Sequence, residues 1–481
     1  MKVYLASWGN PLEWGNAKYR HGPVGVAYYS YTTLPFMMRE YGVDKAIIIA
    51  LDSVITARSR SPNEEALYCA KQAGLNVKDN VVSPGEVKDY NEWVGLVNRY
   101  VTCVAVKSMG IDSAGNINVA VVPYVGVREG VRYGAGSSVE PGVYLTYALA
   151  RLLDILSEAP KAIEESPTAP TAQSAALTQA SGLKDVKELI VDITHGINYM
   201  PLLTVELAKM LASLALALNG FKTGYAVDVR IFNAVEVGTE DNVRVFDVRN
   251  IGELRMGRYY LDPIITAIRT NAKSLDQNEL TVIGSLMMNA PVALIQSCRE
   301  LIKADEASWV LANLTYGELL KAINVSKSSG SYTITFTKYV KPEVAYAKLF
   351  TRCLCASLLD WLKSEKLLGN YMPADRLKEA IAPYFEKVSK ASEVIIRDTF
   401  DSLRRILSRR VAPRQRQVGA AVSVKCYRYI LRNFMAHAGF YMDPEPWLDV
   451  KVDLNVEVGY YKNWDLVKRF IIDCLTRQLL T

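Results

Sequence analysis

Short apolar runs alternate with amphipathic stretches along residues 1–250. Residues 46–51 are a continuous apolar run of the kind that forms a strand buried on both faces of a sheet, and residues 3–6 and 189–193 are also expected to be strands. Strands that alternate with helices predict a parallel, Rossmann-like sheet. The expected helices are residues 24–41, 63–73, 90–108, 143–157 and 199–218, and the other expected strands are 119–124, 226–237 and 243–248. A segment rich in Ala, Pro, Thr and Ser, residues 160–181, is expected to be an insertion.

The pattern changes after residue 250. Helical stretches at 281–297 and 308–323 precede an alternation of apolar residues and threonines at 332–336, which predicts a strand. From residue 342 helix follows helix, with the expected helices at 343–363, 375–389, 391–408, 419–438 and 465–479 and a strand-like excursion at 448–461. The fold class is therefore α/β plus all-α. Three domains are expected: a Rossmann-like domain (1–250), a linker of helical or winged-helix type (251–340) and a helical domain (341–481).

The most apolar stretch, residues 200–219, carries its polar residues Glu206, Lys209 and Ser213 on one narrow stripe. It therefore predicts a buried helix rather than a membrane span. The first residues lead into a strand without the apolar core of a signal peptide. A cytoplasmic protein with no membrane partner is expected.

Composition adds two constraints. A chain of 481 residues that is half hydrophobic has room for two or three domains with real cores. Its seven cysteines are scattered, with no Cys-x2-Cys pair and no histidine close enough to complete a zinc site. We expect buried thiols in a reducing compartment and no metal.

The charge of +6 is mild, but the basic residues cluster. No Asp or Glu occurs from residue 402 to residue 442, a tract that contains nine Lys and Arg residues. Such a composition is typical of a surface that binds a polyanion. Lys425, Arg428 and Arg432 fall at i, i+3 and i+7, one stripe of a helix, and are expected to contact the phosphates of such a polyanion.

One of only three histidines, His437, follows this stripe. Asn433 and His437 lie at i and i+4 on one helical face, whereas Arg432 is about 140° away from His437. A histidine can relay the proton of a ribose 2′-hydroxyl, a guanidinium can stabilise the phosphate, and the amide of Asn433 can orient the imidazole. If Arg432 and His437 cooperate, the arginine must bend round or a second copy of the chain must contribute. In the alternative interpretation Arg432 is a solvated cation and His437 a core histidine.

Three polar loops follow predicted strands: Ser7-Trp8-Gly9-Asn10, Asp52-Ser53 and Thr194-His195-Gly196-Ile197-Asn198. Ligands of open α/β sheets bind at such carboxyl ends. The third loop also opens a helix, whose amides and dipole suit an anion. The sequence contains neither a GxGxxG after the first strand nor a Walker motif.

Two motifs carry a family resemblance. Asp192-Ile193-Thr194-His195-Gly196 is similar to the Asp-x-Thr-His-Gly signature of CARF domains, and Arg432 to His437 resembles the Arg-x4-6-His pattern of HEPN ribonucleases. Together they resemble the CARF–HEPN ancillary ribonucleases of type III CRISPR systems (Csx/Csm group). In that family a CARF dimer binds a cyclic oligoadenylate, most often the tetramer, and the HEPN pair cuts single-stranded RNA.

The resemblance implies that Thr194, His195, Gly196 and Asn198 hold the ligand, with Trp8 stacking on adenine. The neighbouring loops are expected to contribute Ser7, Gly9, Asn10, Asp52 and Ser53.

The resulting expectation is a homodimeric or higher-order endoribonuclease without a cofactor, activated by cyclic tetraadenylate. The alternative is a ligand-sensing transcription regulator that binds DNA through the winged helix, its HEPN-like helices serving only in dimerisation.

Overall fold

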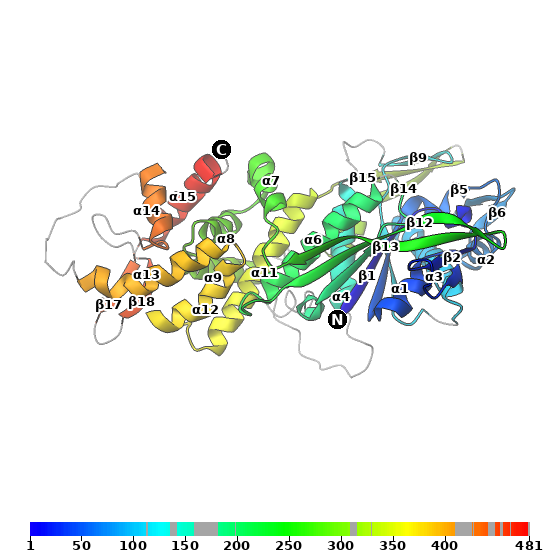
Figure 1. Ribbon diagram of the computed structural model, residues 1–481. Helices are drawn as coiled ribbons and strands as arrows, with labels where there is room; N and C mark the ends of the chain where they lie inside the picture. The colour runs from blue at the N-terminus through cyan, green and yellow to red at the C-terminus, as the bar shows by residue number, and fades with distance from the viewer. Residues whose placement is uncertain are drawn as a thin grey trace, which may run out of the picture.

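The protein is elongated, with an α/β region at one end and a helical region at the other (Figure 1). The computed structural model describes residues 1–111, 114–134, 142–157, 181–197, 199–307, 315–328, 330–408, 426, 428–440, 448–452, 456–461 and 463–479. The expected insertion at 160–181 therefore lies almost wholly outside the described residues.

An eight-stranded mixed sheet forms the core of the α/β region. Its strands are β1 (Lys2–Trp8), β2 (Ala17–Arg20), β3 (Tyr28–Ser30), β4 (Lys45–Leu51), β8 (Ile117–Val122), β11 (Glu188–Asp192), β12 (Val227–Glu240) and β13 (Val243–Met256). Their order is β3-β2-β13-β12-β11-β1-β4-β8, and the last five are mutually parallel. The expected Rossmann-like arrangement is confirmed, with an antiparallel extension through the long β12–β13 hairpin.

Helices cover both faces of this sheet. They are α1 (Leu34–Tyr41), α2 (Glu64–Gln72), α3 (Tyr90–Met109), α4 (Val143–Ser157) and α6 (Met200–Leu218). The chain runs from β1 to β4 and β8 in one direction and returns through β11 to β12, so right-handed crossovers place α1 with α3 on one face and α4 with α6 on the other. The apolar runs of β1 and β4 are fully buried because they lie between these layers.

Helix α6 is the one helix among the described residues that is long and apolar enough to cross a membrane. Two thirds of its apolar window (67%) is buried within the protein, where α6 contacts β1, β11 and β12. Its polar residues Glu206 and Ser213 are hydrogen-bonded to Tyr260, in the segment between β13 and α7.

Residues 251–340 divide between the two regions. Helices α7 (Asp262–Asn271), α8 (Gln277–Met287) and α9 (Pro291–Ala307) pack with the helical region. Helix α10 (Tyr316–Leu320) and the hairpin of β14 (Ile323–Ser328) and β15 (Ser331–Phe336) return to the α/β region. There β15 pairs with β10 (Val131–Tyr133), which pairs with β9 (Gly126–Arg128). The hairpin thus joins a sheet instead of forming a separate winged helix.

The helical region contains α11 (Pro342–Ser364), α12 (Ala374–Glu386), α13 (Lys390–Ser408), α14 (Arg428–Ala436) and α15 (Trp464–Cys474). A small sheet of β16 (Met372–Pro373), β18 (Val456–Tyr461) and β17 (Leu448–Val452) accompanies them, so the expected strand-like excursion is a hairpin. Helix α11 contacts α4 and α6 as well as α7, α8 and α9, and it therefore connects the two regions.

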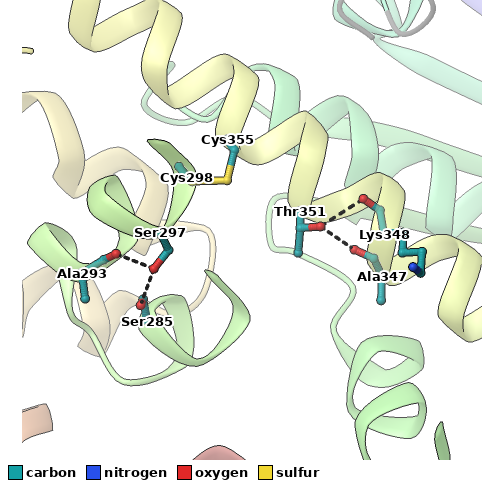
Figure 2. The surroundings of a disulfide bond; sticks show 8 residues. All are labelled: Ser285, Ala293, Ser297, Cys298, Ala347, Lys348, Thr351 and Cys355. Carbon is teal, nitrogen blue, oxygen red and sulfur yellow. Dashed lines mark hydrogen bonds between the residues drawn. A yellow bond between two sulfur atoms is a disulfide. The ribbon is translucent and has the colours of Figure 1, made fainter. Parts of the chain in front are cut away.

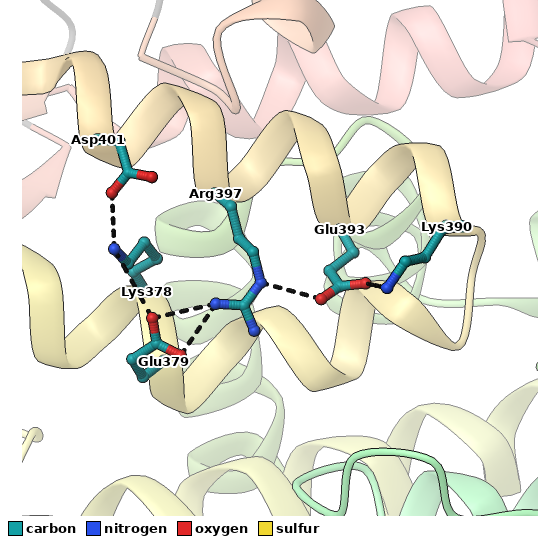
Figure 3. A network of polar contacts seen from close by, with 6 residues as sticks. All are labelled: Lys378, Glu379, Lys390, Glu393, Arg397 and Asp401. Atoms are coloured by element: carbon teal, nitrogen blue, oxygen red, sulfur yellow. Dashed lines mark hydrogen bonds and ion pairs between the residues drawn. The ribbon is translucent and has the colours of Figure 1, made fainter.

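Helices α12 and α13 are held side by side by an ion-pair network (Figure 3). Arg397 donates to both carboxylate oxygens of Glu379, at 3.0 and 2.9 Å, and to Glu393 at 2.9 Å. Lys378 donates to Asp401 at 2.6 Å. Because Glu379 and Asp401 are exposed, the pairs that they form each add only roughly 0–1 kcal/mol to stability.

Three disulfides correct the expectation of free thiols. Cys69 pairs with Cys103 between α2 and α3, and Cys426 pairs with Cys474 beside α14. The third pair, Cys298 with Cys355, joins α9 to α11 (Figure 2). In this order the partners are 34, 48 and 57 residues apart, so local spacing did not reveal them. Closing loops of this length stabilises the fold by about 4 kcal/mol each in the chain-entropy model.

Only Cys353 is a free thiol, and burial raises its pKa to about 12. Disulfide-rich proteins occur in secreted form and inside hyperthermophiles. Cysteine content therefore no longer supports a reducing compartment.

Candidate ligand site and candidate catalytic helix

The order of the sheet reverses between β1 and β11, and the loops that follow these two strands meet there. The amide of Gly9 donates to the carbonyl of His195 at 2.7 Å. A Cβ on Gly9 would lie 2.6 Å from a side-chain carbon of Ile197, and a Cβ on Gly196 would lie 2.4 Å from the hydroxyl of Ser7. Both glycines are needed because the two loops approach so closely. This is the switch point at which open α/β sheets bind ligands.

Asp192 and Thr194 hold these loops from within. The carboxylate of Asp192 accepts hydrogen bonds from the hydroxyl of Tyr4 at 2.7 Å, from the hydroxyl of Thr33 and from the amide of Thr194 at 2.9 Å. The hydroxyl of Thr194 accepts from the amide of Ala234 at 2.9 Å. These bonds join the end of β11 to β1, to β12 and to the start of α1. The side chains of Asp192 and Thr194 therefore hold the loop in shape. The part of the loop that remains available to a ligand is its backbone.

His195 is a neutral aromatic side chain in this arrangement. Its Nε2 accepts a hydrogen bond from the amide of Thr33 at 3.2 Å, so Nδ1 carries the proton of the neutral ring. Trp14 and Tyr19 lie against the ring, with centroid distances of 4.6 and 6.2 Å. Desolvation lowers the pKa of His195 to about 4, although Asp192 acts in the opposite direction. At neutral pH His195 cannot supply a positive charge to a phosphate.

Asp52 and Ser53 are buried at the end of β4 in a short 3-10 helix (Asp52–Ile55). The Asp52 carboxyl accepts from the amide of Tyr124 and from the hydroxyl of Tyr90, both at 2.8 Å. Desolvation raises the pKa of Asp52 to about 7, against the effect of these hydrogen bonds. Asp52 thus ties β4 to α3 and to the loop after β8, and its side chain is not open to a ligand.

Several polar atoms at this edge lack internal partners. Among the described residues, the buried side-chain atoms without a hydrogen bond include the Oγ atoms of Ser7 and Ser53, Nε1 of Trp8 and the hydroxyl of Tyr199. Ser7 and Trp8 end β1, Ser53 follows β4, and Tyr199 precedes α6. Unsatisfied buried groups are costly, and a bound polar ligand or a shift of these loops would satisfy them.

The structure changes the expected aromatic contact. Trp8 is completely buried, so it does not offer a face to adenine. Trp14, which the sequence interpretation did not select, is partly exposed; it lies edge-on to Trp8 at 5.2 Å and covers His195. Asn10 caps a short 3-10 helix (Pro11–Glu13) by accepting from the amide of Leu12 at 3.2 Å. Asn198 lies outside the described residues.

Helix α14 presents the candidate catalytic residues. Arg428 and Arg432 are exposed, while Leu431 and Phe434 are buried, and the ring of Phe434 lies 5.3 Å from that of Phe470 on α15. The amphipathic pattern expected for this helix is therefore present. Asn433 lies on α14, but its side chain is outside the described set, as is all of Lys425.

His437 is exposed in the turn that follows the last residue of α14, one position beyond the helix that was expected to contain it. The helix ends because the amide of Gly439, whose φ is +78°, bonds to the carbonyl of Phe434 at 2.8 Å. A Cβ on Gly439 would lie 2.7 Å from the hydroxyl of Tyr461, so the turn is fixed against β18. His437 and Arg432 thus both face solvent from a well-packed support.

No group of three His, Cys, Asp or Glu side chains suited to a metal ion occurs among the residues that the structure describes.

Comparison with known families places the α/β region. The family model for the CARF domain of the CRISPR system endoribonuclease Csx1 matches residues 3–236. The matched segment runs from β1 into β12 and contains the switch point and all three polar loops. A comparison with curated proteins found no match. The α/β region is thus a CARF domain of the Csx1 type, which supports a CARF-containing, Csx1-like ancillary protein of type III CRISPR systems.

Proposed function

We propose that this protein is a metal-independent endoribonuclease that cuts single-stranded RNA when a cyclic oligoadenylate binds its CARF domain. A Csx1-type CARF domain indicates a sensor of cyclic oligoadenylates in CRISPR defence. The observation that carries the nuclease proposal is the joint exposure of Arg432 and His437 on α14 and the turn after it. Cyclic tetraadenylate is the proposed activator and the cytoplasm the proposed location.

The proposed chemistry uses the chain's own side chains. His437 accepts the proton of the ribose 2′-hydroxyl, which then attacks the adjacent phosphorus, and the 5′-oxygen of the next nucleotide leaves. Arg432 stabilises the negative charge that develops on the phosphate. The products are a 2′,3′-cyclic phosphate and a free 5′-hydroxyl. Asn433 orients the imidazole, and Lys425 and Arg428 hold the RNA backbone.

The active site is proposed to be shared between two copies of the chain. In an unbroken helix Arg432 and His437 would point about 140° apart, and His437 lies in the turn after α14, so we propose that one copy alone does not aim both groups at one phosphate. A two-fold arrangement of α14 and its partner would bring the arginine and histidine pairs together. Dimerisation is accordingly part of the proposal.

The activator is proposed to bind over the meeting loops of β1 and β11. The loop of His195, Gly196 and Ile197 and the start of α6 suit its phosphates, and the partly exposed ring of Trp14 suits a base. The roles of Ser7, Gly9, Asn10, Ser53, His195 and Gly196 are then to contact the ligand or to shape the loop around it. Trp8, Asp52 and Thr194 have a supporting role, because their side chains pack or form hydrogen bonds within the protein beneath these loops.

The regulator alternative has less support. It required a winged helix within residues 251–340, whereas the β14–β15 hairpin pairs through β15 with β10 of the α/β region. No second function is therefore proposed.

The decisive experiment is cleavage of a labelled single-stranded RNA in EDTA, with and without cyclic tetraadenylate, by the wild type and by His437→Ala. We expect cutting that requires the ring, ignores the chelator and disappears in the variant, while thermal unfolding is unchanged. Cutting that survives His437→Ala would overturn the catalytic role of α14. Absence of cutting with rings of every size would overturn the nuclease proposal.

A further inference from the structure

The polar stripe of α6 faces a crossing segment of the chain. Tyr260, between β13 and α7, donates its hydroxyl to Glu206, and its amide donates to the hydroxyl of Ser213 at 2.9 Å. The amine of Lys209 lies 5.5 Å from the centre of the Tyr260 ring. Glu206, Lys209 and Ser213 are thus engaged by the segment that leads into the helical region.

The carboxyl end of α6 is held by α11 and α12. The hydroxyl of Ser357 on α11 donates to the carbonyl of Leu218 at 2.9 Å. Lys387, directly after α12, is 1% exposed, and its amine donates to the carbonyls of Gly220 at 3.0 Å and Lys222 at 2.8 Å. Desolvation lowers the pKa of Lys387 to about 8. A buried amine that binds these carbonyls fixes the end of the helix, because removing it would leave them unsatisfied.

The packing here leaves no space for sliding. A Cβ on Gly220 would lie 2.1 Å from the ring of Tyr384 on α12. The hydroxyl of Tyr384 also lies 3.2 Å from that of Ser357, so α11 and α12 contact the end of α6 as one unit.

The opposite end of α6 forms part of the candidate ligand site. The amide of Met200 donates to the carbonyl of Ile197 at 3.0 Å, and a Cβ on Gly196 would lie 3.0 Å from the ring of Pro201. With 19 residues, α6 spans about 28 Å between the two ends. A mostly buried helix of this length moves as a rigid body rather than bending.

We propose that α6 transmits ligand binding from the β1–β11 switch point to the helical region, with Lys387 as the positioning residue at its far end. The inference rests on the proposed function, because the ligand must contact the loop before α6. A displacement at residues 194–199 cannot be absorbed at Gly220, and it is therefore passed to α11 and α12. The Cys298–Cys355 disulfide joins α11 to α9 (Figure 2), and α9 contacts β18, which seats the turn of His437.

The test is amide hydrogen exchange over residues 374–388, with and without cyclic tetraadenylate, which needs no nuclease activity. In the wild type we expect the ring to slow exchange there by about threefold or more. Lys387→Met and the milder Ser357→Ala should bind the ring with wild-type affinity but lose most of this response, and Lys387→Arg should keep part of it. Ser297→Ala is the matched control, because Ser297 is also buried and donates to a backbone carbonyl but does not touch α6.

Two outcomes would overturn the inference while the activator proposal stands: a wild type that binds the ring with no change over 374–388, or a Lys387→Met variant that responds as the wild type does. In ring-activated cleavage, loss of coupling should appear as about a tenfold lower stimulation with unchanged ring affinity.

If no ring binds the wild type, the activator proposal has failed and Gly196→Ala decides the inference instead. Its new methyl group pushes on Ser7 and Pro201 at the start of α6, and it should alter exchange over 374–388. Tyr332→Phe perturbs the α/β region away from α6 and should not. Equal exchange in the wild type and in both variants would overturn the inference.

Discussion

The two ends of the molecule use their motif residues in opposite ways. At the switch point the side chains of Asp192, Thr194 and His195 are turned inward and hydrogen-bonded, so the motif presents a shaped backbone. On α14 and in the turn after it, the side chains of Arg432 and His437 face solvent, and the buried residues between them support these two side chains. A motif match therefore predicts a location in both regions, but whether the side chain or the backbone acts depends on what surrounds it. This contrast leads to four predictions.

The largest effect is expected at the exposed end. Arg432→Ala and His437→Ala should each reduce ring-activated RNA cleavage by about a thousandfold or more, since each removes charge stabilisation or proton transfer. Neither should change the unfolding midpoint in urea, because neither side chain is packed. A stability loss comparable to the activity loss would mean that these residues are structural, and the contrast would disappear.

Substitutions in the inward-facing motif around Asp192 should instead lower the stability of the fold. Asp192→Ala leaves the hydroxyls of Tyr4 and Thr33 and the amide of Thr194 without an acceptor, and we expect a loss of roughly 3 kcal/mol of unfolding free energy. Asp192→Asn, which keeps two acceptor lone pairs, should lose less. Urea unfolding followed by circular dichroism measures both. An Asp192→Ala variant of wild-type stability that fails to bind the ring would show that Asp192 contacts ligand directly.

Two desolvated groups at the carboxyl edge of the sheet, Asp52 and His195, should give opposite pH dependences of stability. The pKa of Asp52 is raised from 3.8 to about 7, so the folded state binds more protons between these values, and this group's contribution to stability is lost as pH rises from about 4 to 7. The pKa of His195 is lowered from 6.5 to about 4, so its contribution to stability grows as pH rises through that range.

In the wild type the two contributions oppose each other. Asp52→Asn should therefore leave stability that rises between pH 4 and 6.5, and His195→Gln should leave stability that falls between pH 4 and 7. Urea midpoints measured at half-unit intervals test this, and parallel profiles in the two variants would contradict it.

The smallest effect is expected at Trp14. Trp14→Ala should weaken ring binding by roughly tenfold through the loss of one stacking partner, while Trp14→Phe should retain most of the affinity. Cleavage at a saturating ring concentration should be unchanged in both variants. Titration calorimetry provides the affinities. Trp8→Phe serves as the control, because the buried Trp8 ring should affect stability and not ring affinity.

The sequence was sufficient for features that depend on local pattern. The apolar runs of β1 and β4, the length of α6 and the helices from α11 to α15 follow from periodicity and capping, and the meeting of the β1 and β11 loops follows from their place at strand ends. The expected end of α14 at residue 438 lies two residues beyond the observed end at Ala436, although Gly439 is a signal for a helix end.

Features that depend on distant partners were not predictable in the same way. Trp8 lies on a strand buried on both faces, so alternation does not reveal whether its ring is enclosed. The acceptor role of Asp52 comes from Tyr90 and Tyr124, which are 38 and 72 residues away. The cysteine pairs likewise depend on which helices pack together. Residues 315–336 were expected in the linker but belong to the α/β region, because β15 pairs with β10.

The return of the β14–β15 hairpin to the α/β region has a consequence for synthesis on the ribosome. The hydroxyl of Tyr316 donates to the carbonyl of Val121, and that of Tyr332 donates to the carbonyl of Gly85. These contacts close the region around β8 and the loop before α3, yet their donors are translated some 195 and 247 residues after their acceptors. The sensor half can therefore complete its fold only after α7, α8 and α9 of the other half have emerged.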